Sequence, residues 1–89
     1  MYKVVLLSGA IKFYNKLYDS DRSKFERIAN ALTSLQEDPF QGKSLKHLLK
    51  AKYSLRVGVY RIIYKIEKKV VTVYILDIGH RKDIYEGRG

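Results

Sequence analysis

The fold is decided by residues 52–85, which read KYSLRVGVYRIIYKIEKKVVTVYILDIGHRKDIY. Apolar residues alternate with polar ones in this segment, and the alternation breaks at two points where tight turns can form. A period of two places successive side chains on opposite faces of a strand. The segment therefore predicts a three-stranded antiparallel meander, and the rest of the chain supports it.

The first predicted turn has the sequence GV, residues 58–59. A two-residue loop that begins with glycine suits a type II′ turn, because glycine adopts positive φ without steric cost. This register places Arg56 directly opposite Arg61, on the face away from the apolar side chains. Like charges opposite one another destabilise a sheet. We interpret the arginine pair as a site for an anion that lies over both side chains.

The second predicted turn is Lys68-Lys69, followed by a strand over Val70–Ile78. This strand is rich in β-branched and aromatic residues and is apolar on both faces, as in a central strand that is covered on both sides. It is expected to end at Gly79. A polar, basic cluster at the exit of a buried strand is typical of the rim of a cleft. Here the cluster consists of His80, Arg81 and Tyr85.

The segment before the meander predicts one strand and two helices. Tyr2–Leu7 is apolar enough for an internal strand or a well-covered edge strand. Ser8 is a suitable N-cap for a short helix over Ala10–Tyr18. The apolar stripe of this helix consists of Ile11, Tyr14, Leu17 and Tyr18.

The second helix can be capped by Ser20 or Asp19, with Asp21 in its first turn, where a negative charge favours the helix dipole. Pro39 ends this helix, because proline disfavours the α conformation at the residue before it. The apolar stripe of the helix is interpreted as core and consists of Phe25, Ile28, Ala29, Leu32 and Leu35.

Residues 40–52 are expected to return the chain to the sheet as a basic loop, anchored by Leu45, Leu48 and Leu49. The predicted order is β-α-α-β-β-β, an α+β fold in which a helical hairpin packs on one face of a small, mostly antiparallel sheet. Residues 1–89 are long enough for one domain with a single core.

The chain carries a formal net charge of +9, and its distribution is one-sided. No acidic residue occurs between Asp38 and Glu67. A solvated basic face kept for solubility is one interpretation, but so one-sided a block favours binding of a polyanion. The basic residues of this block are Lys43, Lys46, Lys50, Lys52, Arg56, Arg61 and Lys65.

The composition excludes several classes of site. The chain has no cysteine, so disulfides, thiolate metal sites and thiol nucleophiles are excluded, which fits a reducing cytoplasm. The initial apolar run is too short for a signal peptide or a membrane span, and we expect a cytoplasmic protein with no membrane partner. No cluster has metal-ligand spacing and no glycine-rich phosphate loop occurs, so the sequence predicts no metal and no cofactor.

The remaining polar side chains are lysine, arginine, histidine and tyrosine. Such a set suits metal-free cleavage of RNA, in which the 2′-hydroxyl attacks the neighbouring phosphate, because the reaction needs cations around a charged phosphorane together with a proton donor and acceptor. Three strand tyrosines, Tyr60, Tyr64 and Tyr74, are interpreted as core or half-buried residues and not as base-stacking ones.

The segments YSLRVGVYRIIY and GHRKDIY, with LKHLL before them, resemble the RelE/ParE superfamily of bacterial and archaeal toxins from type II toxin–antitoxin modules. The resemblance covers nearly the whole chain, and the β-α-α-β-β-β order of that family agrees with the order predicted from the residues. It implies an endoribonuclease of the RelE type, which cuts messenger RNA in the ribosomal A site and so inhibits translation.

The resemblance also implies roles for individual residues. Arg61 matches the arginine that stabilises charge on the scissile phosphate, and Arg81 matches the proposed proton donor to the leaving 5′-oxygen. Tyr85 matches the tyrosine that stacks on or orients the substrate nucleotide, and Arg56 falls where the family carries a basic residue. The general base stays open between Lys46, Lys50, Lys52 and His80, with Lys52 and His80 placed among the catalytic residues. Arg56, Lys46 and Lys50 are expected to bind substrate.

The implied partners are the ribosome, messenger RNA and a cognate RelB-like antitoxin. The toxin would exist as a free monomer or in a toxin–antitoxin hetero-oligomer. The same fold serves in the ParE branch as a DNA gyrase poison that acts by binding and is not a nuclease. An inactive paralogue that binds only antitoxin or RNA is a further alternative. The arginine, histidine and tyrosine set favours the nuclease.

Overall fold

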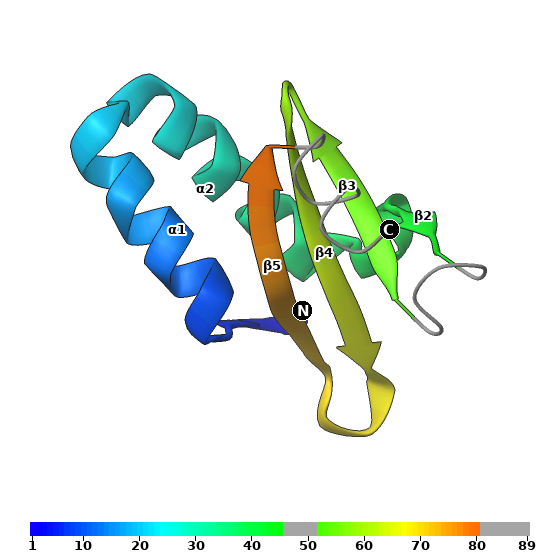
Figure 1. Cartoon of the computed structure of the whole chain (residues 1–89). Coiled ribbons are helices and arrows are strands. Elements are labelled where there is room, and N and C mark those ends of the chain that lie inside the picture. Colours follow the sequence, from blue (N-terminus) through cyan, green and yellow to red (C-terminus); the bar gives the residue numbers. More distant parts are fainter. Residues whose placement is uncertain (46–51, 81–89) are drawn as a thin grey trace.

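A computed structural model describes residues 1–45 and 52–80 of the chain. Two helices form a hairpin that packs on one face of a five-stranded sheet (Figure 1), which confirms the predicted α+β class. The strand order is β1-β5-β4-β3-β2, and β1 runs parallel to β5 while the other neighbours are antiparallel. The elements are β1 Lys3–Leu6, α1 Ser8–Ser20, α2 Arg22–Glu37, β2 Lys43–Ser44, β3 Tyr53–Val57, β4 Tyr60–Glu67 and β5 Thr72–His80, with short 3-10 turns at Pro39–Gln41 and Lys68–Val70.

The first hairpin of the meander has the predicted register. Val57 lies opposite Tyr60 and Arg56 lies opposite Arg61. Gly58 has a φ of 61°, and it is the residue of the two-residue turn with positive φ, as a type II′ turn requires. The prediction for this turn is confirmed.

The second turn differs from the prediction. Lys68–Val70 forms a 3-10 turn, Val71 follows in the left-handed conformation with φ 48° and ψ 50°, and β5 begins at Thr72. The prediction of a two-residue turn at Lys68-Lys69 was wrong, because Glu67 pairs with Thr72 and four residues lie between them. β5 also continues through Gly79 to His80.

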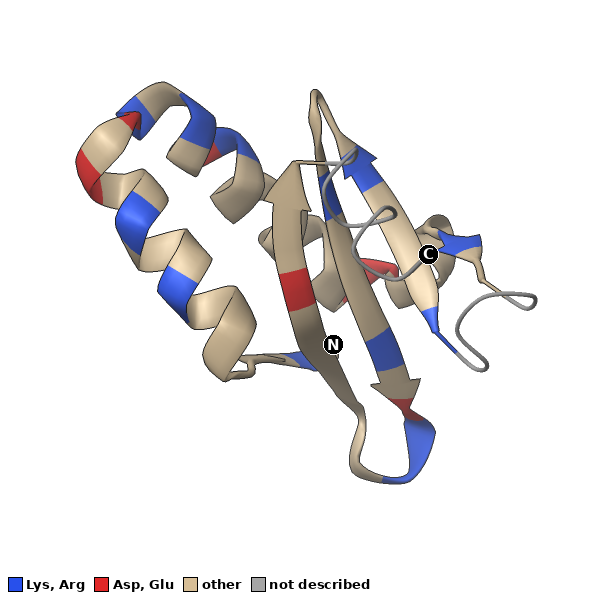
Figure 2. Ribbon diagram, viewed as in Figure 1, with Lys and Arg blue, Asp and Glu red and all other residues tan. Residues whose placement is uncertain are grey.

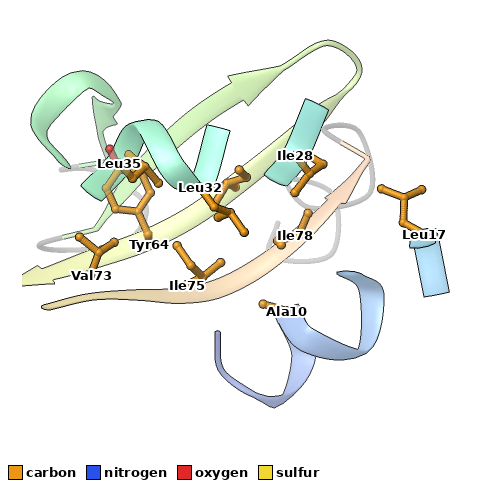
Figure 3. Packing of buried hydrophobic residues seen from close by; sticks show 10 residues of the cluster. Ala10, Leu17, Ile28, Leu32, Leu35, Tyr64, Val73, Ile75 and Ile78 are labelled. Carbon is orange, nitrogen blue, oxygen red and sulfur yellow. The ribbon is translucent and has the colours of Figure 1, made fainter. Parts of the chain in front are cut away.

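A β-bulge interrupts the pairing of β4 with β5, and the sequence pattern did not predict it. Ile63 pairs with Asp77 and Tyr64 pairs with Ile75, so Leu76 is the extra residue. A single inserted residue moves every later side chain of the strand to the opposite face. Ile78 consequently joins Ile75 in the core beneath the helices (Figure 3).

The N-terminal elements lie close to their predicted positions. β1 is an edge strand, which was one of the two expected placements. α1 begins at Ser8, and Leu7 is its N-cap without a side-chain hydrogen bond, so the prediction of a Ser8 cap was wrong. The expected stripe was wrong in part, because Ile11 and Tyr18 are 44% and 43% exposed. Ala10 and Leu17 are the buried residues of α1.

The second helix has the expected core and a different cap. The Asp21 carboxylate accepts a hydrogen bond from the backbone N–H of Lys24 at 3.2 Å and so caps α2. Ser20 and Asp19 cannot take this role, because α1 continues through both of them and leaves Asp21 between the helices. The buried residues of α2 are Ile28, Leu32 and Leu35, all from the predicted stripe.

The segment after α2 is more ordered than the expected loop. Pro39–Gln41 forms a 3-10 turn, and β2 pairs antiparallel with β3 through Lys43 and Ser54. Leu45 is buried, as predicted for an anchor. The other two expected anchors, Leu48 and Leu49, lie outside the described residues.

Tyr64 anchors this segment to the sheet. Its side chain is 0% exposed, its hydroxyl donates a hydrogen bond to the carbonyl oxygen of Pro39 at 2.8 Å, and it accepts one from the backbone N–H of Gly42 at 3.0 Å. Burial raises the pKa of the Tyr64 hydroxyl to about 12, an effect that the Gly42 N–H opposes in part. Tyr64 is thus a core residue, as interpreted from the sequence.

Candidate functional site

Strand alternation divides the side chains of the central hairpin between two faces. Tyr53, Leu55 and Val57 of β3 pack into the core beneath the helices. The residues between them point to the other side of the sheet, which we call the second face. On β3 and β4 the second face is formed by Ser54, Arg56, Arg61, Ile63 and Lys65.

Arg56 and Arg61 are direct cross-strand neighbours on the second face. Side chains at such positions have Cβ atoms about 5 Å apart. Arg56 is exposed, whereas Arg61 is half-buried, and Arg61 Nη1 donates a hydrogen bond to Ser54 Oγ at 3.3 Å. The second face therefore holds two adjacent cations, one of them fixed by its neighbours.

Ser54 is a site residue that the sequence analysis missed. It is 2% exposed and holds the guanidinium of Arg61 from the neighbouring strand. The available signal was a polar residue between two apolar ones, at the position diagonal to Arg61. That signal is weak, because serine is common on the polar face of any strand.

Lys52 lies farther from the arginine pair than Ser54 does. It directly precedes β3, and its carbonyl oxygen accepts a hydrogen bond from the backbone N–H of Leu45 at 2.8 Å. By alternation Lys52 belongs to the second face, but it lies four positions before Arg56, which corresponds to about 13 Å along an extended strand. Lys52 therefore lies near the opposite end of β3 from the arginine pair.

His80 lies at the same end of the sheet as Arg61, but on the other face. It is exposed, it pairs with Tyr60, and the two ring centroids are 6.4 Å apart. Tyr60 in turn contacts Phe13 of α1 edge-on, with ring centroids 5.6 Å apart. The bulge at Leu76 causes this placement, because without it His80 would share the second face with Arg61.

Four predicted site residues lie outside the described residues: Lys46, Lys50, Arg81 and Tyr85. Their roles stay predictions. Within residues 1–45 and 52–80, no group of three histidine or acidic side chains could hold a metal ion. No helix in this part of the chain is long and apolar enough to cross a membrane.

Positive charge gathers at one end of the hairpin. Arg56 and Arg61 form the pair next to Val57 and Tyr60, which close the two-residue turn. Figure 2 shows basic segments of β3 and β4 near this turn, with basic segments of α2 on the other side of the sheet. Near the second turn, by contrast, Lys65 Nζ lies 3.7 Å from a carboxylate oxygen of Glu67. The end with the two-residue turn is therefore the better place for an anionic ligand.

The sequence matches the family model described as ParE toxin of type II toxin-antitoxin system, parDE, over residues 4–85. The chain belongs to this ParE toxin family. The resemblance to the RelE/ParE superfamily is thereby confirmed.

Individual relatives of this ParE-family chain are toxins as well. Toxin RelG of Mycobacterium tuberculosis is 41% identical over 56 residues, which cover 62% of the chain and 64% of RelG. In the crystal structure of the toxin-antitoxin complex RelBE2 from Mycobacterium tuberculosis, the matched chain has a TM-score of 0.79 and 29% identity, and the match covers 90% of this chain and 98% of that one. The isolated E. coli RelE toxin shares the fold, with a TM-score of 0.77 at 21% identity over 98% and 94% of the two chains.

Proposed function

We propose that this ParE-family chain is the toxin of a type II toxin–antitoxin system and a metal-free endoribonuclease that cuts messenger RNA in the ribosomal A site. The observation that carries the proposal is the cross-strand pair of Arg56 and Arg61, with Arg61 held by Ser54. Such a pair weakens the sheet unless an anion lies over it. A phosphodiester supplies that anion, and cleavage of messenger RNA would inhibit translation.

The reaction needs two proton transfers and stabilisation of one highly charged state. A base removes the proton of the 2′-hydroxyl, the 2′-oxygen forms a bond to phosphorus, and the bond from phosphorus to the 5′-oxygen breaks as that oxygen takes a proton from an acid. The products are a 2′,3′-cyclic phosphate and a 5′-hydroxyl. A half-buried guanidinium stabilises the phosphorane because its N–H donors match two phosphate oxygens and need no reorganisation.

The roles of the surrounding residues follow from the resemblance and from position. Arg61 would stabilise the phosphorane, Arg81 would donate the proton to the 5′-oxygen, and Tyr85 would orient the nucleotide. Arg56 would bind the neighbouring phosphate, with Lys46 and Lys50 as further contacts to substrate.

Two of the candidate general bases lie among the described residues. Lys52 is on the second face with Arg61, which favours it, although several residues of β3 separate the two. His80 is at the correct end of the sheet, but its ring lies beside Tyr60 on the helix face. A strand of RNA that crosses the rim could bring the 2′-hydroxyl to either one.

A type II toxin needs an antitoxin, and the positive charge of this chain predicts an acidic one. We expect a RelB-like segment with acidic residues that meet the second face and fold on binding. The affinity should fall as salt is added, because salt screens exposed charges.

A second candidate function is supported by the description of the matching family, which is that of a ParE toxin. A ParE-type protein would poison DNA gyrase by binding it and would cleave no RNA. Under this alternative the arginine pair would contact the partner protein or DNA.

The test maps messenger RNA ends in a purified translation system, beside a gyrase supercoiling assay. The wild-type chain should cut within A-site codons, and Arg61→Gln should lower the rate about 100-fold, as expected for loss of one transition-state donor. Arg22→Gln is the matched control, because Arg22 is stacked on Tyr18 at 3.7 Å, away from the second face. Absence of cuts together with inhibited supercoiling would replace the nuclease by the gyrase poison.

A further inference from the structure

A pocket of about 140 Å³ lies between α2 and the turn of the first hairpin. Its wall is apolar on the hairpin side and basic on the helix side, and no acidic residue contributes to it. We call it the tip pocket, and it is lined by Lys24, Arg27, Val57, Gly58, Val59 and Tyr60.

Arg27 lies against the glycine of the hairpin turn. A Cβ atom at Gly58 would be 3.5 Å from Arg27 Nη1, so the guanidinium packs on the backbone of the turn. Lys24 lies three residues earlier on the same side of α2, where side chains at this spacing are neighbours. The geometry thus places two cations beside a small apolar wall.

The two cations differ in their partners. Lys24 Nζ lies 3.6 Å from a carboxylate oxygen of Asp21, in an exposed pair. Arg27 forms no ion pair with any carboxylate of residues 1–45 or 52–80. Arg27 is therefore the stronger anion-binding group of the pocket, and its planar donors can bind two oxygens of one phosphate.

The position of the tip pocket indicates its ligand. Val57 and Tyr60 line it on the helix side of the hairpin, while the next residues outward from the turn, Arg56 and Arg61, form the cation pair on the second face. Two cationic sites therefore flank the same two-residue turn, as the blue segments of α2, β3 and β4 show in Figure 2. A single-stranded nucleic acid carries an anion on every residue and can contact both sites at once.

We propose that the tip pocket binds one nucleotide of the RNA strand that crosses Arg61, with its phosphate on Arg27 and Lys24 and its ribose against Val57 and Val59. This inference rests on the proposed nuclease function for the identity of the strand. Arg27 is a positioning residue in this arrangement, because it would contact the RNA at a nucleotide away from the bond that is cut. A protein segment with acidic and apolar residues is the competing ligand, and it is an outcome of the test.

The first experiment measures binding without the ribosome. Titration of the ¹⁵N-labelled chain with adenosine 5′-monophosphate should give saturable NMR shifts at the Gly58 and Val59 amides. Arg27→Gln should weaken this binding about tenfold, whereas Arg22→Gln, on the same helix but outside the pocket, should not. Adenosine, which lacks the phosphate, should bind more weakly than its monophosphate.

A second pair of variants tests the wall of the pocket. Val59 is 48% exposed, so substitution there leaves the core intact. Val59→Glu places a carboxylate beside Arg27 and should abolish the shifts, while Val59→Gln, of similar size, should retain most of the affinity. Equal effects of the two variants would overturn the proposal.

The salt dependence provides an independent measure. For binding of an eight-nucleotide single-stranded RNA, loss of one phosphate contact lowers the slope of log K against log salt by about 0.7. Arg27→Gln should show this decrease and Arg22→Gln should not. Shifts at the turn with the peptide acetyl-Glu-Leu-Glu-Leu-amide, and none with the nucleotide, would overturn the proposal in favour of a protein ligand.

The two proposals fail in different ways. If translation-coupled cleavage is absent but Arg27 binds the nucleotide, the nuclease proposal fails and the binding site stands. If cleavage occurs, Arg27→Gln should raise KM about tenfold and leave kcat unchanged, because a positioning residue contributes to binding in both ground and transition states. Cleavage with an unchanged KM, together with unchanged nucleotide affinity, would overturn the tip pocket alone.

Discussion

The turn end of β4 and the middle of this strand differ in their burial and in their interactions. At the turn end, two arginines face each other across the strands and exposed Val59 forms part of the turn. In the middle of the strand, Tyr64 is fully buried, stacks on Tyr53 with centroids 5.4 Å apart, and makes two hydrogen bonds. Burial is concentrated in this middle part, where Ile62, Ile63 and Tyr64 are 0% exposed, and the turn end can therefore carry repulsive charge for binding.

The largest effect is expected at Gly42, which lies close to Tyr64 in the buried middle of β4. A Cβ atom there would overlap the Tyr64 hydroxyl and lie 3.0 Å from the carbonyl oxygen of Ser54. Gly42→Ala should lower the free energy of unfolding by about 3 kcal/mol, through overpacking and loss of the hydroxyl hydrogen bonds, as measured by urea denaturation. Gly9→Ala is the matched control, because its Cβ would meet only the Leu76 carbonyl oxygen at 3.8 Å in a helix that favours alanine. Similar losses in both variants would contradict the comparison.

Tyr64 itself makes the stability contributed by the buried middle of β4 dependent on pH. Its pKa is raised to about 12 in the folded chain, while tyrosine in the unfolded chain titrates near 10. Above pH 10 the unfolded state has lost the proton that the folded state keeps, so this contribution to stability is lost as pH rises from about 10 to about 12. Tyr64→Phe should cost about 2 kcal/mol at neutral pH and show a flatter decline in alkali. Parallel alkaline profiles for the variant and the wild type would exclude this role.

Substitutions at the turn end should lower stability less, and they should act through the backbone conformation of the turn. Gly58 has a φ of 61°, so Gly58→Ala should cost about 1 kcal/mol of stability. Gly58→Asn should cost less, because asparagine tolerates the left-handed conformation better than alanine. Denaturant midpoints of both variants measure the difference. An alanine variant as stable as the wild type would show that the turn does not require positive φ.

The smallest expected change in stability is a gain and not a loss. Arg56→Gln removes the repulsion with Arg61 and should stabilise the fold by about 0.5 kcal/mol, with a gain that shrinks as salt is added. The same variant should bind single-stranded RNA more weakly. Lys65→Gln is the control, since Lys65 is paired with Glu67 and its removal should bring no gain. A loss of stability in Arg56→Gln would mean that the arginine pair supports the fold.

The two turns of the sheet could be predicted from the sequence only where glycine occupies the position with positive φ. The first hairpin was predicted in register because glycine occupies the position that needs it. The second turn places that conformation at Val71, a β-branched residue that adopts it rarely, so the pattern gave no signal. The N-cap of α2 was also predicted at the wrong residue. Ser20, Asp19 and Asp21 are all of residue types that cap helices well, and packing selects among them.

The candidate site was predictable in part. Alternation in β3 and β4 was sufficient to place Arg56 opposite Arg61. It was insufficient for His80, because one extra residue at Leu76 reverses the faces and no sequence signal marks that bulge. The basic residues of α2 beside the turn were missed because contacts between distant segments leave no periodic pattern. Arg27 meets Gly58 only in the folded chain.

The parallel pairing of β1 with β5 has a consequence for biosynthesis. Lys3 lies beside Thr72, so the one strand that pairs with β1 is β5, the last strand among the described residues. Synthesis proceeds from the N-terminus, and contacts between distant segments form slowly because a long loop must close first. The helices are synthesised well before β5, but until β5 exists β1 has no neighbouring strand and the core beneath the helices lacks Val73, Ile75 and Ile78. The sheet that supports the arginine pair is therefore completed only after β5 has been synthesised.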